Sequence, residues 1–107
     1  MAINYEKIRK RFLPMTETMF YILLSIRQER HGYGIMKHVK ELTGGRIELG
    51  AGTVYQSLKK LEGDGLIMHT QEVEARKNYI ITEIGEKILI EETARIKEIY
   101  NNLGSIL

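Results

Sequence analysis

The sequence predicts a mainly α-helical fold with a small β-hairpin, and two patterns carry this prediction. Apolar residues recur at helical spacing in four segments, and a fifth segment is apolar on nearly every side, which together predict five helices. Residues 67–82 instead form two short strand-like runs around a polar tip, which indicates a hairpin. With 107 residues, 43% hydrophobic and 28% charged, the chain suits one globular domain with a modest core.

Composition excludes several classes of site and favours one kind of partner. The chain has no cysteine, so a disulfide, a thiol nucleophile and a cysteine metal site are excluded. Residues 1–82 hold 13 Lys and Arg against 9 Asp and Glu, whereas residues 83–107 hold 3 against 5. We therefore expect any polyanion to meet the first part. The longest apolar run, residues 19–24, is too short to span a bilayer, so a cytoplasmic protein without a membrane partner is expected.

The first two predicted helices flank Pro14. Residues 2–13 form a short basic amphipathic helix that the proline ends. Its basic side chains could touch phosphate or an anionic membrane, but a solvated face is the simpler interpretation. Thr16 is a good N-cap for the second helix. Because this helix is apolar on nearly every side, we expect it at the centre of the core.

The run H-G-Y-G at residues 31–34 predicts a turn before a third helix over residues 35–42. Free amides at the start of that helix would accept a phosphate, with His31, Tyr33 and Lys37 nearby as donors. His31 and His38 have no third ligand at a suitable spacing, so no metal site is expected. Residues 46–49 alternate polar and apolar, which indicates a short strand.

The fourth predicted helix follows Gly50 and Gly52, which permit a close backbone approach, with Thr53 as a plausible N-cap. Val54, Leu58 and Leu61 share one face that should be buried, whereas polar residues occupy the other faces. A short helix with a polar exposed start suits the DNA major groove, although an ordinary surface helix would show the same pattern. The polar set is Thr53, Gln56, Ser57, Lys59 and Lys60.

The hairpin and the last helix complete the chain. Arg76 and Lys77 fall near the hairpin tip, where Glu72 and Glu74 dilute their charge. Residues 83–103 form the longest helix, and its apolar residues recur every seven positions with partners three further on. So much apolar surface predicts a partner helix, most economically the same helix of a second copy, with packing inside one chain as the alternative. We therefore divide the chain into residues 1–82 and a dimerisation helix at 83–107.

The order helix, helix, short strand, helix, hairpin is typical of a winged helix–turn–helix. The sequence also resembles the PadR family of bacterial transcriptional regulators over about residues 12–89. It is most similar to the small subfamily with a single C-terminal helix. Four runs carry the resemblance in the same order: F-L-P-M-T-E-T-M-F-Y-I-L-L, H-G-Y-G-I, G-G-R-I-E-L-G-A-G-T-V-Y-Q-S-L-K-K-L-E-G-D-G-L-I and Y-I-I-T-E-I-G-E-K-I-L.

The resemblance implies a cytoplasmic homodimeric repressor that binds a pseudo-palindromic operator in double-stranded DNA, with one recognition helix per half-site. The single C-terminal helix, with help from the N-terminal helix, would form the dimer. The DNA-binding residues would be Tyr33, Lys37, Thr53, Tyr55, Gln56, Lys59, Arg76 and Lys77. The dimer interface would include Ile8, Phe12, Leu89, Ile96, Ile99, Tyr100 and Leu103.

The residues themselves agree for Gln56, which can pair bidentately with adenine, and for Lys59, which suits phosphate. The Tyr55 ring is expected to be half in the core, with only its hydroxyl reaching phosphate. Two features depart from the family: the wing is short and poor in basic residues, and there is no tryptophan to sandwich a planar drug. An apolar or phenolic effector could still lie between subunits, with a filled dimer core as the alternative. Its pocket would be lined by Phe12, Met15, Met19, Ile96 and Tyr100.

Two other functional classes compete with DNA binding. The first is a protein-interaction module with a degenerate DNA face, which a weak dependence of binding on salt would favour. The second is an enzyme. No nucleophile–base pair is evident, and the glycines at 50 and 52 lack the G-K-[ST] run of a phosphate loop. Neither catalysis nor a cofactor is expected.

Overall fold

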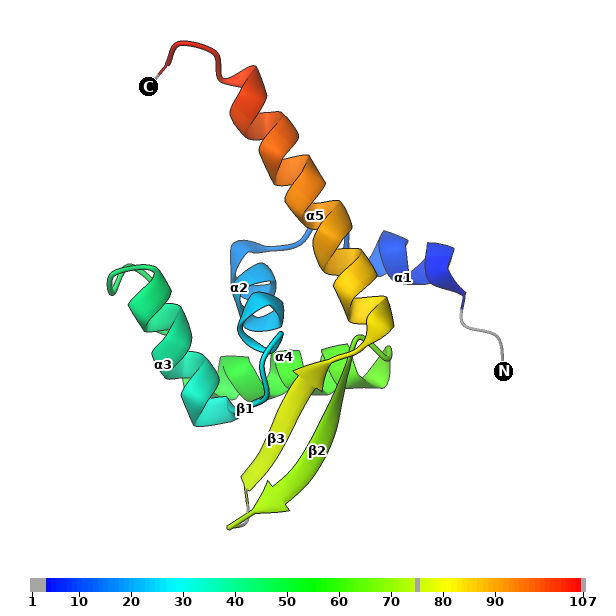
Figure 1. The fold of residues 1–107 in the computed structure, drawn as a ribbon, viewed down its shortest axis with the longest axis vertical. Coiled ribbons are helices and arrows are strands. Elements are labelled where there is room, and N and C mark those ends of the chain that lie inside the picture. Colours follow the sequence, from blue (N-terminus) through cyan, green and yellow to red (C-terminus); the bar gives the residue numbers. More distant parts are fainter. Residues whose placement is uncertain (1–3, 75, 107) are drawn as a thin grey trace.

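The computed structural model describes residues 4–74 and 76–106. A helical body carries the hairpin at one end and the last helix, which extends away as an arm, at the other (Figure 1). The molecule is flat, with extents of 50 × 39 × 20 Å. Its elements are α1 (Tyr5–Phe12), α2 (Glu17–Ser25), β1 (Arg30–His31), α3 (Gly32–Leu42), α4 (Ala51–Gly63), β2 (Ile67–Val73), β3 (Arg76–Ile81) and α5 (Glu83–Asn102).

The core is organised around α2, which confirms the central place predicted for that helix. Ile22 and Leu23 of α2 and the adjacent Ile26 are completely buried. Helices α3, α4 and α5 all pack against α2. Complete burial of each such side chain contributes about 1.5–3 kcal/mol relative to exposure. The other fully buried apolar side chains are Ile35, Val39, Val54, Leu58, Leu61, Leu66, Ile67 and Ile88.

Side-chain caps fix where several helices begin. The Thr16 hydroxyl accepts a hydrogen bond from the Met19 amide at 3.1 Å, which confirms the predicted cap of α2. The start predicted for the third helix was wrong, because α3 already begins at Gly32. The Gly34 amide donates to His31 Nδ1 at 3.0 Å, so His31 caps the helix and the H-G-Y-G run forms its first turn.

The strand predicted at residues 46–49 was also wrong, because this segment is a loop. The Ile47 amide donates to the Thr43 hydroxyl at 3.1 Å, which closes a turn after α3. Arg46 instead reaches Glu17 of α2 at 2.9 Å. The third strand of the small sheet is β1, which pairs antiparallel with β3 through Arg30 and Tyr79. The strand order is β1-β3-β2.

The hairpin has a fixed base and a separate tip. At the base, the Ile81 amide donates to the Ile26 carbonyl at 2.8 Å, and Ile67 is buried. The pairing of β2 with β3 shifts by one residue between His69 and Glu72, so β2 carries a bulge there. A bulge bends and twists its strand. The bulge therefore changes the direction of β2 between the base and the tip of the hairpin.

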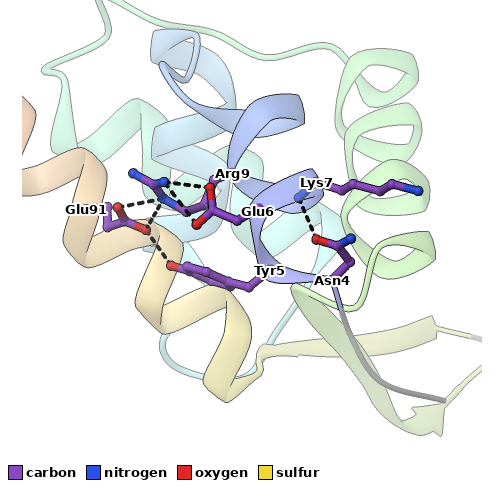
Figure 2. A network of polar contacts seen from close by, with 6 residues as sticks. All are labelled: Asn4, Tyr5, Glu6, Lys7, Arg9 and Glu91. Atoms are coloured by element: carbon purple, nitrogen blue, oxygen red, sulfur yellow. Dashed lines mark hydrogen bonds and ion pairs between the residues drawn. The ribbon is translucent and has the colours of Figure 1, made fainter.

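Helix α1 folds back over the start of α5 through a polar network (Figure 2). The Tyr5 hydroxyl donates to Glu91 Oε2 at 2.5 Å, and Arg9 Nε donates to Glu91 Oε1 at 2.9 Å. Burial, and then the hydrogen bond to Glu91, raises the pKa of Tyr5 to about 12. Arg9 also pairs with Glu6 on its own helix at 3.1 Å.

This packing corrects part of the predicted dimer interface. Ile8, Phe12 and Leu89 lie in the core of the single chain, each 4% exposed. The reason is that α1 covers the first turns of α5, so these apolar side chains are already buried within one copy. In the part of the chain that the structure describes, no helix is both long and apolar enough to cross a membrane.

A close backbone contact at Gly85 generates the first prediction. A Cβ at this position would lie 2.0 Å from the Leu66 carbonyl oxygen and 2.7 Å from Ile81 Cγ1. We expect Gly85→Ala to lower the free energy of unfolding by about 2–4 kcal/mol in urea titrations. Gly63→Ala is the matched control, because a methyl group there would meet no atom within 4 Å and alanine favours a helix by about 0.5 kcal/mol. Equal stability of the two variants would contradict the contact.

The Tyr5–Glu91 bond generates the second prediction. Because the pKa of Tyr5 is raised from 10.0 to about 12, its contribution to stability is complete below about pH 10 and disappears as pH rises through about 12. Tyr5→Phe should cost about 1 kcal/mol at neutral pH. In a tyrosinate absorbance titration it should remove one late-titrating group. Tyr33→Phe, at a tyrosine that is 64% exposed, should leave that late step intact.

Candidate nucleic-acid interface

Helix α4 begins at Ala51 with Gly50 as its N-cap, so the N-cap predicted at Thr53 was wrong. The Val54 amide already donates to the Gly50 carbonyl at 3.1 Å, and Gly50 has the extended backbone of a cap residue. Thr53 therefore lies in the first turn with an exposed side chain. No side-chain hydrogen bond caps α4 at Gly50.

The buried and exposed faces of α4 divide as the spacing predicts. Val54, Leu58 and Leu61 are at most 1% exposed. Gln56 and Lys59 lie on the opposite side and are exposed, as expected from the angle of about 100° per residue. These two side chains are therefore free to meet a ligand outside the core.

Tyr55 joins α4 to the start of α3. A Cβ on Gly32 would lie only 2.7 Å from Cζ and the hydroxyl oxygen of the Tyr55 ring. Tyr55 is nevertheless 51% exposed, so the ring is half packed as expected. Its hydroxyl end, however, is the part that lies next to Gly32. Gly32 is thus required here because the ring lies directly on its backbone.

Helix α3 presents a second set of polar groups beside α4. Tyr33 is 64% exposed, and its ring stacks near that of His31 at a centroid distance of 6.4 Å. Lys37 is exposed one turn further along the same helix. His38 faces inward, where its Nδ1 lies 3.0 Å from the Ser25 hydroxyl, and burial together with nearby Arg30 lowers its pKa. Residues 4–74 and 76–106 contain no cluster of three His, Asp or Glu side chains suited to a metal.

The wing carries both charges. Arg76 and Lys77 are exposed at the start of β3, next to the tip. Glu72 pairs in register with Lys77, and Glu74 lies at the tip with a φ of 51°. The acids therefore stand beside the cations, as the sequence indicates.

One contact between the wing and α4 is absent from the sequence-based expectations. Glu62 Oε2 accepts from the His69 amide at 3.1 Å and lies 2.5 Å from His69 Nδ1. These bonds to His69 are the main reason that the pKa of Glu62 is lowered. The signal in the sequence is a short separation, because Glu62 near the end of α4 precedes His69 near the start of β2 by seven residues.

The apolar stripe of α5 continues beyond the body of the chain. Ile88 and Leu89 are buried, but the same face of the helix then becomes exposed. The exposed residues, with their exposed fractions, are Ile96 (40%), Ile99 (47%), Tyr100 (66%), Leu103 (39%) and Ile106 (78%).

Only part of the predicted effector pocket comes together in one chain. A cavity of about 420 Å³ between α2 and α5 is lined by Met15 and Ile96, together with the ion pair of Glu92 and Arg95. Phe12 is instead buried in the core. Met19 is half-buried against the core, and Tyr100 is exposed further along α5. Glu92 is 1% exposed and also accepts from the Met15 amide at 3.1 Å.

Two crossed helices followed by a hairpin define the protein as a winged helix–turn–helix. A model of the transcriptional regulator PadR-like family matches residues 21–91. The chain therefore belongs to this family, which is one of transcriptional regulators and not of enzymes.

Three individual proteins illustrate the relationship. Transcriptional regulator YqjI from Escherichia coli (strain K12) is 30% identical over 92 residues, which are 85% of this chain and 44% of that protein. The chain thus spans less than half the length of this relative. Bacillus subtilis PadR, solved in complex with operator DNA, has a TM-score of 0.63 and 27% identity over 71% of this chain and 47% of that chain. The alignment with the structure of a transcriptional regulator from Clostridium thermocellum covers 99% of this chain and 99% of that chain, with a TM-score of 0.71 and 23% identity.

Proposed function

We propose that this chain is a sequence-specific regulator that binds double-stranded operator DNA, with α4 as its recognition helix. The observation that carries the proposal is the exposed face of α4, where Gln56 and Lys59 lie opposite a fully buried apolar face. The major groove admits one α-helix, and α3 and the wing flank α4 where the DNA backbones border that groove. The solved operator complex of Bacillus subtilis PadR supports this proposal.

The side chains on this surface have different roles. Gln56 would read a base, because its amide can both donate and accept at the edge of adenine. Lys59, together with Thr53 and Tyr55, would contact the backbone or adjacent base edges. Phosphate contacts that carry no sequence information would come from α3 and the wing. Those residues are Tyr33, Lys37, Arg76 and Lys77.

A homodimer would be formed by α5, with residues 1–82 as the DNA-binding part and residues 83–107 as the dimerisation helix. The support is the apolar stripe that begins in the core and continues exposed along the helix. Two copies related by a two-fold axis would present two recognition helices to a pseudo-palindromic site. The proposed interface residues are Ile96, Ile99, Tyr100 and Leu103.

We propose that the protein is a cytoplasmic repressor and that a small apolar or phenolic effector relieves the repression. The cavity beside Met15 and Ile96 supports it, because it opens next to the proposed dimer seam. Binding of an effector there would change how α5 packs on α2, and with it the spacing of the two recognition helices.

The test is a titration of the protein with its own promoter DNA and with a scrambled duplex at two salt concentrations. Tighter, salt-sensitive binding to the promoter is expected, since each neutralised phosphate releases counterions. Equal, weak binding to both duplexes would favour the alternative of a protein-interaction module.

The division of roles on α4 generates the third prediction. Gln56→Ala should change the preference for one base pair, at a cost of about 1–3 kcal/mol on the preferred site. Lys59→Ala should weaken binding to all sequences alike and lower the salt slope by about 1. Competition titrations with single-base variants of the operator measure both effects. Identical losses on every duplex for both variants would contradict this division.

The dimer seam generates the fourth prediction. Ile96→Asp places a charge in the apolar stripe, and monomers should result because an unpaired charge is costly to bury. Light scattering measures the mass directly. Asn101→Asp is the matched control, because it adds the same charge at an exposed position on another face of α5. A dimer mass for both variants would place the interface elsewhere.

A further inference from the structure

The wing is joined to the recognition helix at His69. Glu62 Oε2 lies 2.5 Å from His69 Nδ1 and 3.1 Å from the His69 amide nitrogen. The second ring nitrogen, Nε2, therefore points away from the carboxylate. The imidazole is 51% exposed.

Polar side chains from both elements surround this imidazole. On the sheet, His69 pairs directly with Tyr79, so the two side chains share the face that looks toward α4. Lys77 lies two residues before Tyr79 on β3, hence on the same face, and its charge helps to lower the pKa of Glu62. On α4, Tyr55, Lys59 and Glu62 follow one another at spacings of four and three along one flank.

The position of His69 matters because of what must pass beside it. With α4 in the major groove and the wing alongside, the DNA strand that borders the groove would pass next to the junction of these two elements. His69 is the last residue of β2 before the bulge, so its place is fixed by the base of the hairpin and by Glu62, not by the tip.

We propose that His69, held in place by Glu62, is a phosphate-binding residue of the DNA interface. The protonated imidazole donates from Nδ1 to Glu62 and from Nε2 to a phosphate oxygen. Glu62 is the positioning residue of this pair. The inference rests on the proposed DNA-binding function and adds to it a contact between the recognition helix and the wing.

Charge explains why the pair is suited to this role. A lone carboxylate on this flank of α4 would repel the DNA, whereas the Glu62–His69⁺ pair is neutral and keeps one N–H donor facing outward. Because the pKa of Glu62 is lowered from 4.5, this carboxylate stays ionised wherever an imidazole titrates. The proposed contact uses the charged form of the imidazole, so the affinity should rise as pH falls.

The chain has two other histidines, but neither would produce this effect. His31 accepts the Gly34 amide on Nδ1, so protonation there would remove the cap of α3 and weaken the site. His38 bonds to Ser25, which is buried in the core. Protonation of His31 would lower the affinity at low pH, so a rise in affinity at low pH would not come from His31.

The experiment is the fifth prediction. Operator affinity of the full chain is measured at about pH 6 and about pH 8, each over a salt series, for the wild type and His69→Asn. Asparagine can still donate to Glu62 but cannot become charged. We expect His69→Asn to bind about three- to tenfold more weakly at the lower pH and like the wild type at the higher pH. The salt slope should fall by about 1 only at the lower pH.

Three control variants distinguish the loss of a DNA contact from a loss of structure. Met68→Ala changes an exposed neighbour on the other face of β2 and should leave both affinities unchanged. His31→Asn keeps a capping side chain and should retain the rise in affinity at low pH. Glu62→Gln should leave thermal unfolding nearly unchanged but reduce the pH dependence, because it no longer favours the charged imidazole.

The outcomes distinguish this inference from the function on which it rests. If the wild type shows no preference for the operator, both are overturned. If the wild type binds the operator specifically but His69→Asn matches it at both pH values, only the role of His69 is overturned. A loss of equal size at both pH values would also overturn it, because it would indicate a misplaced wing and not a lost charge.

Discussion

The burial of α2 at the centre of the core is the constraint on which the rest of the structure depends. Ile22, Leu23 and Ile26 are completely buried, so neighbouring elements must cover this helix from several directions. Helices α3, α4 and α5 do so, and the Ile81 amide bonds the base of the hairpin to the Ile26 carbonyl. Because α4, the hairpin and α5 all pack on one short apolar helix and the residue that follows it, their relative placement depends on the packing around α2.

The sequence predicted those elements whose signals are local. The spacing of Val54, Leu58 and Leu61 located the buried face of α4, and Thr16 located the start of α2. The predictions were wrong where a distant contact or an unusual hydrogen-bond partner determines the local structure. His31 caps α3 through a ring nitrogen, which propensity rules do not anticipate. Residues 46–49 alternate like a strand but have no strand beside them to pair with.

The candidate site shows the same division. Exposure of Gln56 and Lys59 followed from helical spacing, whereas the bond between Glu62 and His69 depends on how the hairpin returns to α4. Glu62 and His69 are only seven residues apart, but the geometry that joins them is fixed by the pairing of β2 with β3 and not by helical or strand spacing. Likewise, a seven-residue repeat marked the stripe on α5 but could not show that α1 already covers its first part, including Leu89.

The hydrogen bond from the His69 amide to Glu62 has a consequence for solubility. Strand β2 is an edge strand of the sheet, and an edge strand offers unpaired amides to which another chain can add. The His69 amide already donates to the Glu62 carboxylate. The bulge that follows His69 interrupts the regular hydrogen-bonding pattern that an added strand would need. Glu62 thus bonds the base of the wing to α4 and also protects that part of β2 against edge-to-edge aggregation.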